Sequence, residues 1–283
     1  MKVLVAGAHG MVGRAVAAHC LAQGDEVFAH DRQSLDITNH ESVRTAFERE
    51  RPQTVINCAA WTDVDGCERD PERAAAVNSH AVENLALNCR RAGASFVTIS
   101  TDYVFDGHRE GFYTQRDDPN PESVYGAAKL EGERRAQAAS ARTVVVRTGW
   151  IFGADGRNFL STVIERARRG ERLKAITDAY GTPTSANDLA ARLRELAQLD
   201  LPGIYHVVNA GSGVSFEEFT RAALLAAGLG AVEIESVRMD TLQRPAPRPR
   251  NSRLRCLLSE AVGLAALPDW ESALSVFAKQ ISK

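Results

Sequence analysis

The sequence predicts an α/β protein with a doubly wound parallel sheet and a smaller α/β lobe toward its C-terminus. Short apolar runs without polar alternation take turns with helical patterns of ten or more residues, which is typical of βαβ units with right-handed crossovers. The 283 residues are 44% hydrophobic and 25% charged. This composition indicates a globular protein with a large core, and the length suits one large domain or a large domain that carries a smaller one.

The first half of the chain carries the regular alternation. The apolar run VLVA predicts a buried strand over residues 2–6, and Gly24 ends the helical pattern that runs from Met11 to Ala22. Further strands are predicted over residues 26–30, 54–58, 95–100 and 143–147, and further helices over 41–50, 71–91, from about 123, and over 158–169. Because helices of this length separate the strands, we expect a parallel sheet covered on both faces.

The alternation loosens after about residue 150. Strands are predicted over residues 173–177 and 204–208 and helices over 187–198 and 216–227, while residues 243–250 hold three prolines and three arginines. No Gly/Ser-rich linker marks a boundary, so the two parts are expected to pack tightly. We predict a first domain over residues 1–150 and a smaller lobe over 151–283, interleaved with the end of the sheet.

Charge and cysteine usage narrow the class of protein. The 34 basic and 36 acidic residues give a net charge of −2, which argues against a nucleic-acid partner. The five cysteines are widely spaced and form no metal-ligand cluster, so we expect a reducing compartment and no metal site. The N-terminus reaches a glycine before a signal-peptide core would be complete, and no apolar stretch is long enough to span a bilayer. We therefore expect a cytoplasmic protein with no membrane partner.

A glycine-rich turn follows the first predicted strand. In GAHGMVG, Gly7 allows the tight turn, Gly10 lets the backbone approach a pyrophosphate, and Gly13 lets the helix lie close to the strand. Met11 and Val12 open the helix, whose positive N-terminus suits phosphates. The spacing G-x-x-G-x-x-G departs from the strict dinucleotide fingerprint, and a turn without a ligand is the alternative. We predict a Rossmann-type dinucleotide site.

The end of the second strand bears on the choice of cofactor. Asp31 favours NAD because its carboxylate can accept the ribose hydroxyls, whereas Arg32 favours NADP because it can pair with the 2′-phosphate. A solvated turn is the alternative for both residues. Asp36 and Ile37 offer a second carboxylate and an apolar surface for adenine. The small residues Ala59 and Ala60, after the next strand, leave room for the cofactor.

Tyr125 and Lys129 are the strongest candidates for chemistry. Residues four apart lie on one face of a helix, and a lysine charge near a phenol lowers its pKa, so that it can exchange a proton with a carbonyl. An ordinary surface pair is the alternative. Thr101 ends a strand upstream, where a hydroxyl can hydrogen-bond the substrate carbonyl.

These features together resemble the extended short-chain dehydrogenase/reductases. Five local strings are similar to those of the dTDP-4-dehydrorhamnose reductases: STDYVFDG (100–107), RTGWIFG (147–153), NF (158–159), YGTPT (180–184) and RPRNSRL (248–254). They occur in the expected order over nearly the whole chain. The resemblance implies reduction of the C4 keto group of a nucleotide-linked 6-deoxyhexose, dTDP-4-dehydro-L-rhamnose above all, with NADPH, or alternatively NADH, as the cofactor.

The resemblance also implies roles for individual residues. Tyr125 is then the proton donor, and Lys129 is its electrostatic partner, which also holds the nicotinamide ribose. Thr101 and Asp102 would contact the substrate, and Trp150 would line the sugar pocket, with core packing as the alternative. The dinucleotide would be bound by Gly7, Gly10, Met11, Val12, Gly13, Asp31, Arg32, Asp36, Ile37, Ala59 and Ala60.

Residues 244–255 hold five arginines and no acid, and they extend the resemblance to the nucleotide end of the substrate. Arg248 and Asn251 would bind its phosphates, because a guanidinium suits that geometry, although a solvated loop is the alternative. The resemblance also implies that Asn78 would order a proton-relay water, with an ordinary polar position on a helix as the alternative.

The sequence departs from the family pattern at two points. Some members carry magnesium-binding glutamates, one just after the glycine turn, but here Gly13-Arg14-Ala15 occupies that place and argues against magnesium. Asp178-Ala179-Tyr180-Gly181 lacks the usual glutamine.

Two alternatives to the reductase stay open: a sugar epimerase that retains NAD, and a non-catalytic NADP-binding subunit resembling that of methionine adenosyltransferase. The oligomeric state, monomer or homodimer, is left open.

Overall fold

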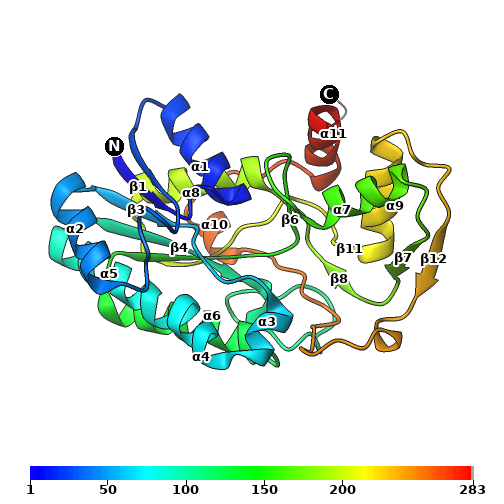
Figure 1. Cartoon of the computed structure of the whole chain (residues 1–283), viewed down its shortest axis with the longest axis horizontal. Coiled ribbons are helices and arrows are strands. Elements are labelled where there is room, and N and C mark those ends of the chain that lie inside the picture. The colour runs from blue at the N-terminus through cyan, green and yellow to red at the C-terminus, as the bar shows by residue number, and fades with distance from the viewer. Residues whose placement is uncertain (282–283) are drawn as a thin grey trace.

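A six-stranded parallel sheet forms the centre of the computed structural model, which describes residues 1–281 (Figure 1). Its spatial order is β10-β5-β4-β3-β1-β2, and every neighbouring pair is parallel. The strands span β1 (Lys2–Ala6), β2 (Glu26–His30), β3 (Thr54–Asn57), β4 (Ser95–Thr101), β5 (Thr143–Thr148) and β10 (Gly203–His206). The predicted Rossmann-type doubly wound fold class is confirmed.

Helices cover both faces of this sheet (Figure 1). On one face, α1 (Met11–Ala22) and α8 (Ala186–Leu199) pack against each other and bury an apolar cluster that includes Val16 and Leu193. On the other face, α2 (His40–Glu50), α5 (Ala81–Ala92) and α6 (Val124–Ala139) bury a second cluster around Phe47 and Leu85. Two buried clusters on opposite faces explain why apolar residues follow one another without polar alternation in β1 and in the middle of β5.

The predicted helix over residues 71–91 consists of three segments. α4 (Pro71–Ala75) begins after the N-cap Asp70, whose carboxylate accepts a bond from Arg73 N at 3.0 Å. A wide π-helical turn, η1 (Ala76–His80), then leads into α5, and α3 (Val64–Arg69) precedes the three segments. Periodicity cannot reveal this wide turn, because it changes the hydrogen-bond spacing without interrupting the helical path.

The smaller part of the molecule lies at the carboxyl end of the sheet and holds a third apolar cluster, which includes Phe152, Leu160 and Phe277 (Figure 1). It contains three two-stranded pairings, β7 with β12, β8 with β11, and β6 with β9. Its strands are β6 (Ile151–Phe152), β7 (Leu173–Ile176), β8 (Tyr180–Gly181), β9 (Thr184–Ser185), β11 (Val214–Ser215) and β12 (Ile234–Val237). Its helices are α7 (Phe159–Arg168), α9 (Phe216–Ala226) and α11 (Trp270–Ile281), and the short 3₁₀ turn η3 (Met239–Thr241) follows β12. The short helix α10 (Leu257–Ala261) packs against β10 of the central sheet instead, and the 3₁₀ turn η2 (Asp102–Val104) follows β4.

The arginine-rich segment connects the two halves of the chain. The backbone of Tyr113 pairs with Arg253 and Arg255, while Tyr180 pairs with Arg250 and Ser252. β10, from the second half, completes the sheet beside β5. The domain boundary at residue 150 stays a prediction. Among the described residues, no helix has the length and apolar character needed to cross a membrane.

Candidate active site

A cavity of about 480 Å³ lies at the carboxyl edge of the sheet, where the segments after β1, β3, β4 and β5 meet α6. It brings together most of the residues that the sequence singled out for the nicotinamide end and the chemistry. The predicted residues in its lining are Gly10, Met11, Val12, Gly13, Ala59, Ala60, Thr101, Asp102, Tyr125, Lys129 and Trp150. The carboxyl edge is where parallel α/β sheets bind their ligands.

The three glycines of the turn have different surroundings. Gly7 has φ +77°, and a Cβ placed on it would lie 2.7 Å from Ala59 N. A Cβ on Gly13 would lie 2.7 Å from Ala8 Cα and closer still to the Gly7 oxygen, whereas one on Gly10 would meet only that oxygen, at 3.4 Å. Gly7 and Gly13 are therefore needed for the fold itself. Gly10 leaves the N-terminus of α1 open to the cavity, and this opening fits a pyrophosphate.

A second cavity of about 480 Å³ continues from the first toward the end of β2. Its lining contains the remaining predicted cofactor residues, namely Gly7, Asp31, Arg32, Asp36 and Ile37, and shares Gly10, Ala59 and Ala60 with the first cavity. The two cavities together form one continuous surface along this edge.

Asp31 is largely engaged by its own turn. Its Oδ1 accepts bonds from the backbone of Gln33 at 3.0 Å and of Ser34 at 2.9 Å, while Oδ2 lies 2.9 Å from His9 Nδ1. The bonds from Ser34 hold the pKa of Asp31 below its ordinary value. Arg32 is exposed and lines the same cavity, so a cation is available where a 2′-phosphate would lie.

Trp61 and Arg73 are two further residues at this cavity, and the sequence analysis missed both. The Arg73 guanidinium carbon lies 4.2 Å from the centre of the Trp61 ring, and both side chains line the cavity. Asn78 holds this tryptophan from behind, because its amide accepts from Trp61 N and donates to Trp61 O, both at 2.9 Å. The amide of Asn78 is thus engaged with the backbone, and its role in a proton relay stays a prediction. An aromatic residue directly after Ala59-Ala60 was the available signal.

Helix α6 presents Tyr125 and Lys129 to the first cavity on one face. Ser123 caps the helix by accepting from Gly126 N at 3.1 Å, and a Cβ on Gly126 would collide with the Tyr103 carbonyl. This close backbone packing fixes the start of the helix beside β4. Tyr125 is 9% and Lys129 is 4% exposed, and Lys129 Nζ donates to the carbonyl of Ile99 at 2.7 Å.

Burial is the largest cause of the pKa shifts of the ionisable side chains in this cavity. It raises the pKa of the Tyr125 phenol above its ordinary value, against the opposing hydrogen bond with Thr101. The pKa of this phenol is therefore raised and not lowered as the sequence predicted, because the low-dielectric surroundings disfavour the phenolate. The phenol keeps its proton at neutral pH, as a proton donor must. Burial also lowers the pKa of Lys129 to about 8 and raises that of Asp102 to about 6.

Aromatic residues form part of the cavity lining. Trp150 has φ +47° and stacks on Phe216 with ring centres 3.7 Å apart, and Gly181 leaves room for the indole because a Cβ there would overlap it. Trp150, Phe216 and Phe159 also line a smaller adjoining cavity of about 210 Å³ together with Asp102. Trp150 thus both packs against the lobe and faces the cavities. This stacked wall is suited to the apolar face of a sugar or base.

The structure places Arg248 and Asn251 in contacts within the fold. Arg248 Nη1 donates to Asp65 Oδ1 at 2.5 Å and to the Ala246 carbonyl at 2.7 Å. Asn251 donates both amide hydrogens to the carbonyls of Arg109 and Gly111, at 2.6 and 2.7 Å. Their predicted contacts with phosphates stay predictions. The sequence offered no signal for these distant partners.

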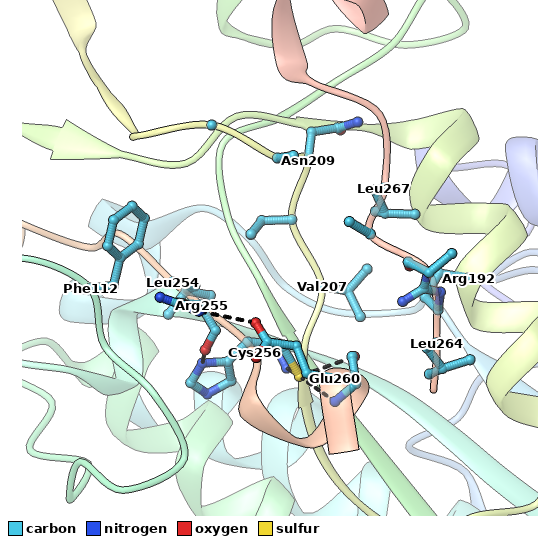
Figure 2. A pocket seen from close by; sticks show the side chains of 17 residues that line it. Phe112, Arg192, Val207, Asn209, Leu254, Arg255, Cys256, Glu260, Leu264 and Leu267 are labelled. Atoms are coloured by element: carbon cyan, nitrogen blue, oxygen red, sulfur yellow. Dashed lines mark hydrogen bonds and ion pairs between the residues drawn. The ribbon is translucent and has the colours of Figure 1, made fainter. Parts of the chain in front are cut away.

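A further cavity, of about 320 Å³, lies beyond the end of β10 (Figure 2). Its walls come from Val207 to Gly211, from Arg192 of α8 and from residues 254–267. Cys256 accepts bonds there from the Gln115 amide at 3.0 Å and from Ser259 Oγ at 3.1 Å. This cavity contains none of the predicted site residues. Within residues 1–281, no group of three or more His, Cys, Asp or Glu residues is placed to hold a metal ion.

The comparisons with known proteins agree with one another. The chain matches the family described as the RmlD substrate binding domain over residues 1–283. It is 38% identical to the dTDP-4-dehydrorhamnose reductase of Mycolicibacterium smegmatis, covering 96% of this chain and 84% of that protein. A crystal structure of a dTDP-4-dehydrorhamnose reductase from Clostridium acetobutylicum superposes with a TM-score of 0.96 at 36% identity, covering 100% of both chains. One from Bacillus anthracis in complex with NADP gives 0.94 at 32% identity, covering 98% of this chain and 99% of that one.

Proposed function

Because the chain belongs to the RmlD substrate binding domain family, that of the dTDP-4-dehydrorhamnose reductases, we propose that it is the corresponding reductase. It uses NADPH to reduce the C4 keto group of a nucleotide-linked 6-deoxyhexose, dTDP-4-dehydro-L-rhamnose, to dTDP-L-rhamnose. One observation supports this proposal above all. The glycine-rich turn lines the same cavity as Thr101, Tyr125 and Lys129.

The cofactor supplies a hydride to C4 of the sugar, and this chain supplies the proton and the geometry. Thr101 hydrogen-bonds the keto oxygen and orients it toward Tyr125. As the oxygen gains negative charge, the Tyr125 phenol donates its proton to it, so the carbonyl becomes a secondary alcohol and the tyrosine becomes a phenolate. Lys129 stabilises this phenolate because a cation buried nearby acts strongly in a low-dielectric site. A proton from solvent then restores the phenol.

The two parts of the chain divide the binding. Residues 1–150 bind the dinucleotide, with Arg32 at the 2′-phosphate, and end in Trp150, which lies against the sugar. Residues 151–283 bind the rest of the sugar nucleotide, with Arg248 and Asn251 toward its phosphates. The protein acts in the cytoplasm. Its five cysteines are all free, which is what a reducing compartment maintains.

Replacement of Tyr125 by Phe tests the assignment. The expected result is loss of turnover by about 10²- to 10⁴-fold with nearly unchanged NADPH affinity, because only the proton donor is removed. The substrate is generated enzymatically and supplied with NADPH or NADH, and loss of reduced-nicotinamide absorbance is followed. Tyr103→Phe is the matched control, since this ring packs edge-on against Tyr125 in the same cavity and is assigned no proton transfer.

The same assay separates the alternatives. An epimerase that retains NAD gives product without net consumption of NADPH, and a binding subunit gives cofactor binding without product. A Tyr125→Phe variant with a tenth or more of the wild-type turnover contradicts the assignment of the proton donor.

A further inference from the structure

The face of α6 that carries Tyr125 and Lys129 carries one more ionisable group, Glu133, four residues further along. Glu133 is 3% exposed, although a glutamate on a helix is normally at the surface. The neighbouring Glu131, on the outer face, is about half exposed and pairs with Arg135 at 2.6 Å. The helix therefore turns one glutamate toward the sheet, directly behind the proposed catalytic pair.

Glu133 is held rigidly in this place. Arg147 of β5, itself 3% exposed, approaches both carboxylate oxygens, with Nε at 3.0 Å from Oε1 and Nη2 at 2.7 Å from Oε2. Ser100 of β4 donates a third hydrogen bond to Oε1. The helix cannot retreat, because a Cβ on Gly132 would collide with the carbonyl of Asn78 in η1. A buried ion pair such as Glu133 with Arg147 often stabilises a fold less than apolar side chains of the same size would. This pair is therefore a candidate for a role in the reaction.

The polar and charged groups around Lys129 come from α6, β4, β5, β10 and η1. On α6, Tyr125 and Glu133 lie four residues before and after Lys129, and the charge of Glu133 acts on it. Strand β4 contributes the Ile99 carbonyl, and Asp102 lies just beyond that strand. Arg147 lies behind Glu133 on β5. His206 of β10 lies beyond Arg147, and burial, followed by the charge of Arg147, lowers its pKa to about 4, so it is neutral. From η1, Asn78 and Ser79 are buried and carry no charge.

Within this set, Glu133 opposes the effect of burial on Lys129. Burial lowers the pKa of the ammonium and the charge of Glu133 partly opposes this, which leaves a pKa of about 8. The ammonium is therefore close to losing its proton near neutral pH, where a change in one neighbouring charge decides its state.

We propose that Glu133 is a positioning residue for the reduction, which keeps Lys129 protonated and in place beside Tyr125, and that Arg147 anchors Glu133 for this purpose. The inference rests on the proposed function for the chemistry, and on the described contacts for the positions of the three side chains. Glu133 acts through Lys129 and does not touch the substrate.

The variant Glu133→Gln keeps the shape and the acceptor oxygen but removes the charge, and it leaves Arg147 as an uncompensated cation. Lys129 then loses its proton at lower pH. We expect the alkaline limb of the kcat profile to move down by about one pH unit or more, so that kcat falls about fivefold or more at pH 8 and much less at pH 6. The variant Glu131→Gln, on the outer face of the same helix, leaves the profile in place.

A binding measurement separates this inference from the proposed function. NADPH titrations followed by tryptophan fluorescence, repeated across pH, report the charge of Lys129 without turnover. The affinity of Glu133→Gln should fall at a lower pH than that of the wild type, by the same shift as the kcat limb. If the wild-type protein binds NADPH but reduces no sugar, the proposed function fails while the binding profiles still test Glu133.

Two further variants keep the test decisive. Glu133→Asp retains the charge, so its alkaline limb should stay at the wild-type pH even if the variant is less stable or slower; this also covers the case in which Glu133→Gln does not fold. In the double variant Glu133→Gln/Arg147→Met the uncompensated cation is gone, and the limb should move part of the way back. A loss of activity by the same factor at every pH, with the limb unmoved, shows a merely structural role and overturns the proposal.

Discussion

Gly13→Ala and Gly10→Ala, a matched pair three residues apart in one turn, test the different roles of the two glycines. In the Gly13 variant the new Cβ would lie 2.7 Å from Ala8 Cα, where ordinary contact begins at 3.4 Å, so α1 must retreat from the turn by roughly 0.7 Å or more. Such overpacking against backbone costs about 3 kcal/mol. The better helix propensity of alanine recovers about 1 kcal/mol, which leaves a net loss of about 2 kcal/mol.

The assay is thermal unfolding combined with NADPH titration. A net loss of about 2 kcal/mol lowers the unfolding midpoint of Gly13→Ala by roughly 4 to 8 °C, and NADPH affinity should fall as well because α1 moves. Gly10 is the N-cap of α1, and a Cβ there reaches only the Gly7 oxygen at 3.4 Å. Gly10→Ala should therefore lose at most about 1 kcal/mol of stability but bind NADPH much more weakly. Equal stability losses in the two variants, or a Gly13→Ala protein as stable as the wild type, would refute the reasoning.

Three further predictions concern the cofactor, the core and the response to acid. Arg32→Ala should weaken NADPH binding about tenfold and leave NADH binding unchanged, because only NADPH offers a phosphate; equal effects on both cofactors in titrations would contradict this. Leu193→Ala, at a fully buried position of α8, should cost about 2 to 5 kcal/mol in denaturant unfolding, whereas Leu199→Ala on the same helix, at a 44% exposed position, should cost under about 0.5. Asp25 is buried, which opposes its charge, but Arg194 Nε at 2.6 Å and the N-terminal amine hold its pKa below the ordinary value. The stability this gives is complete above about pH 4 and is lost as the pH falls through the lowered pKa, so the difference between Asp25→Asn and wild type should shrink toward pH 2.

The regular part of the fold was predictable from the sequence because its signals are local. Apolar runs without alternation mark β1, β3 and β5, and a spacing of four marks Tyr125 and Lys129 as neighbours on a helix. The carboxyl-edge rule then places the segments after these strands together, which is why most of the predicted residues line one cavity.

The missed features depend on partners far away in the sequence. β12, with the sequence IESV, is short and half exposed, and it is a strand only because it pairs with β7 some sixty residues earlier. Arg248 forms an ion pair with Asp65, and no local sequence pattern predicts this ion pair. The sequence analysis did not single out Glu133, since its burial depends on Arg147 of a later strand. The raised pKa of Tyr125 was missed for the same reason, because burial is a property of the whole fold.

The place of β10 beside β5 has a consequence for how the protein is made. β5 is buried along all six residues, but its outer neighbour follows about 55 residues later in the chain. At 5 to 20 residues per second, a ribosome needs roughly 3 to 11 s to deliver that neighbour. During this interval the valine-rich edge of β5 is open to pairing with other nascent chains. The yield of folded protein should therefore depend on the speed of translation and on chaperones that shield this edge, more than on the final stability of the molecule.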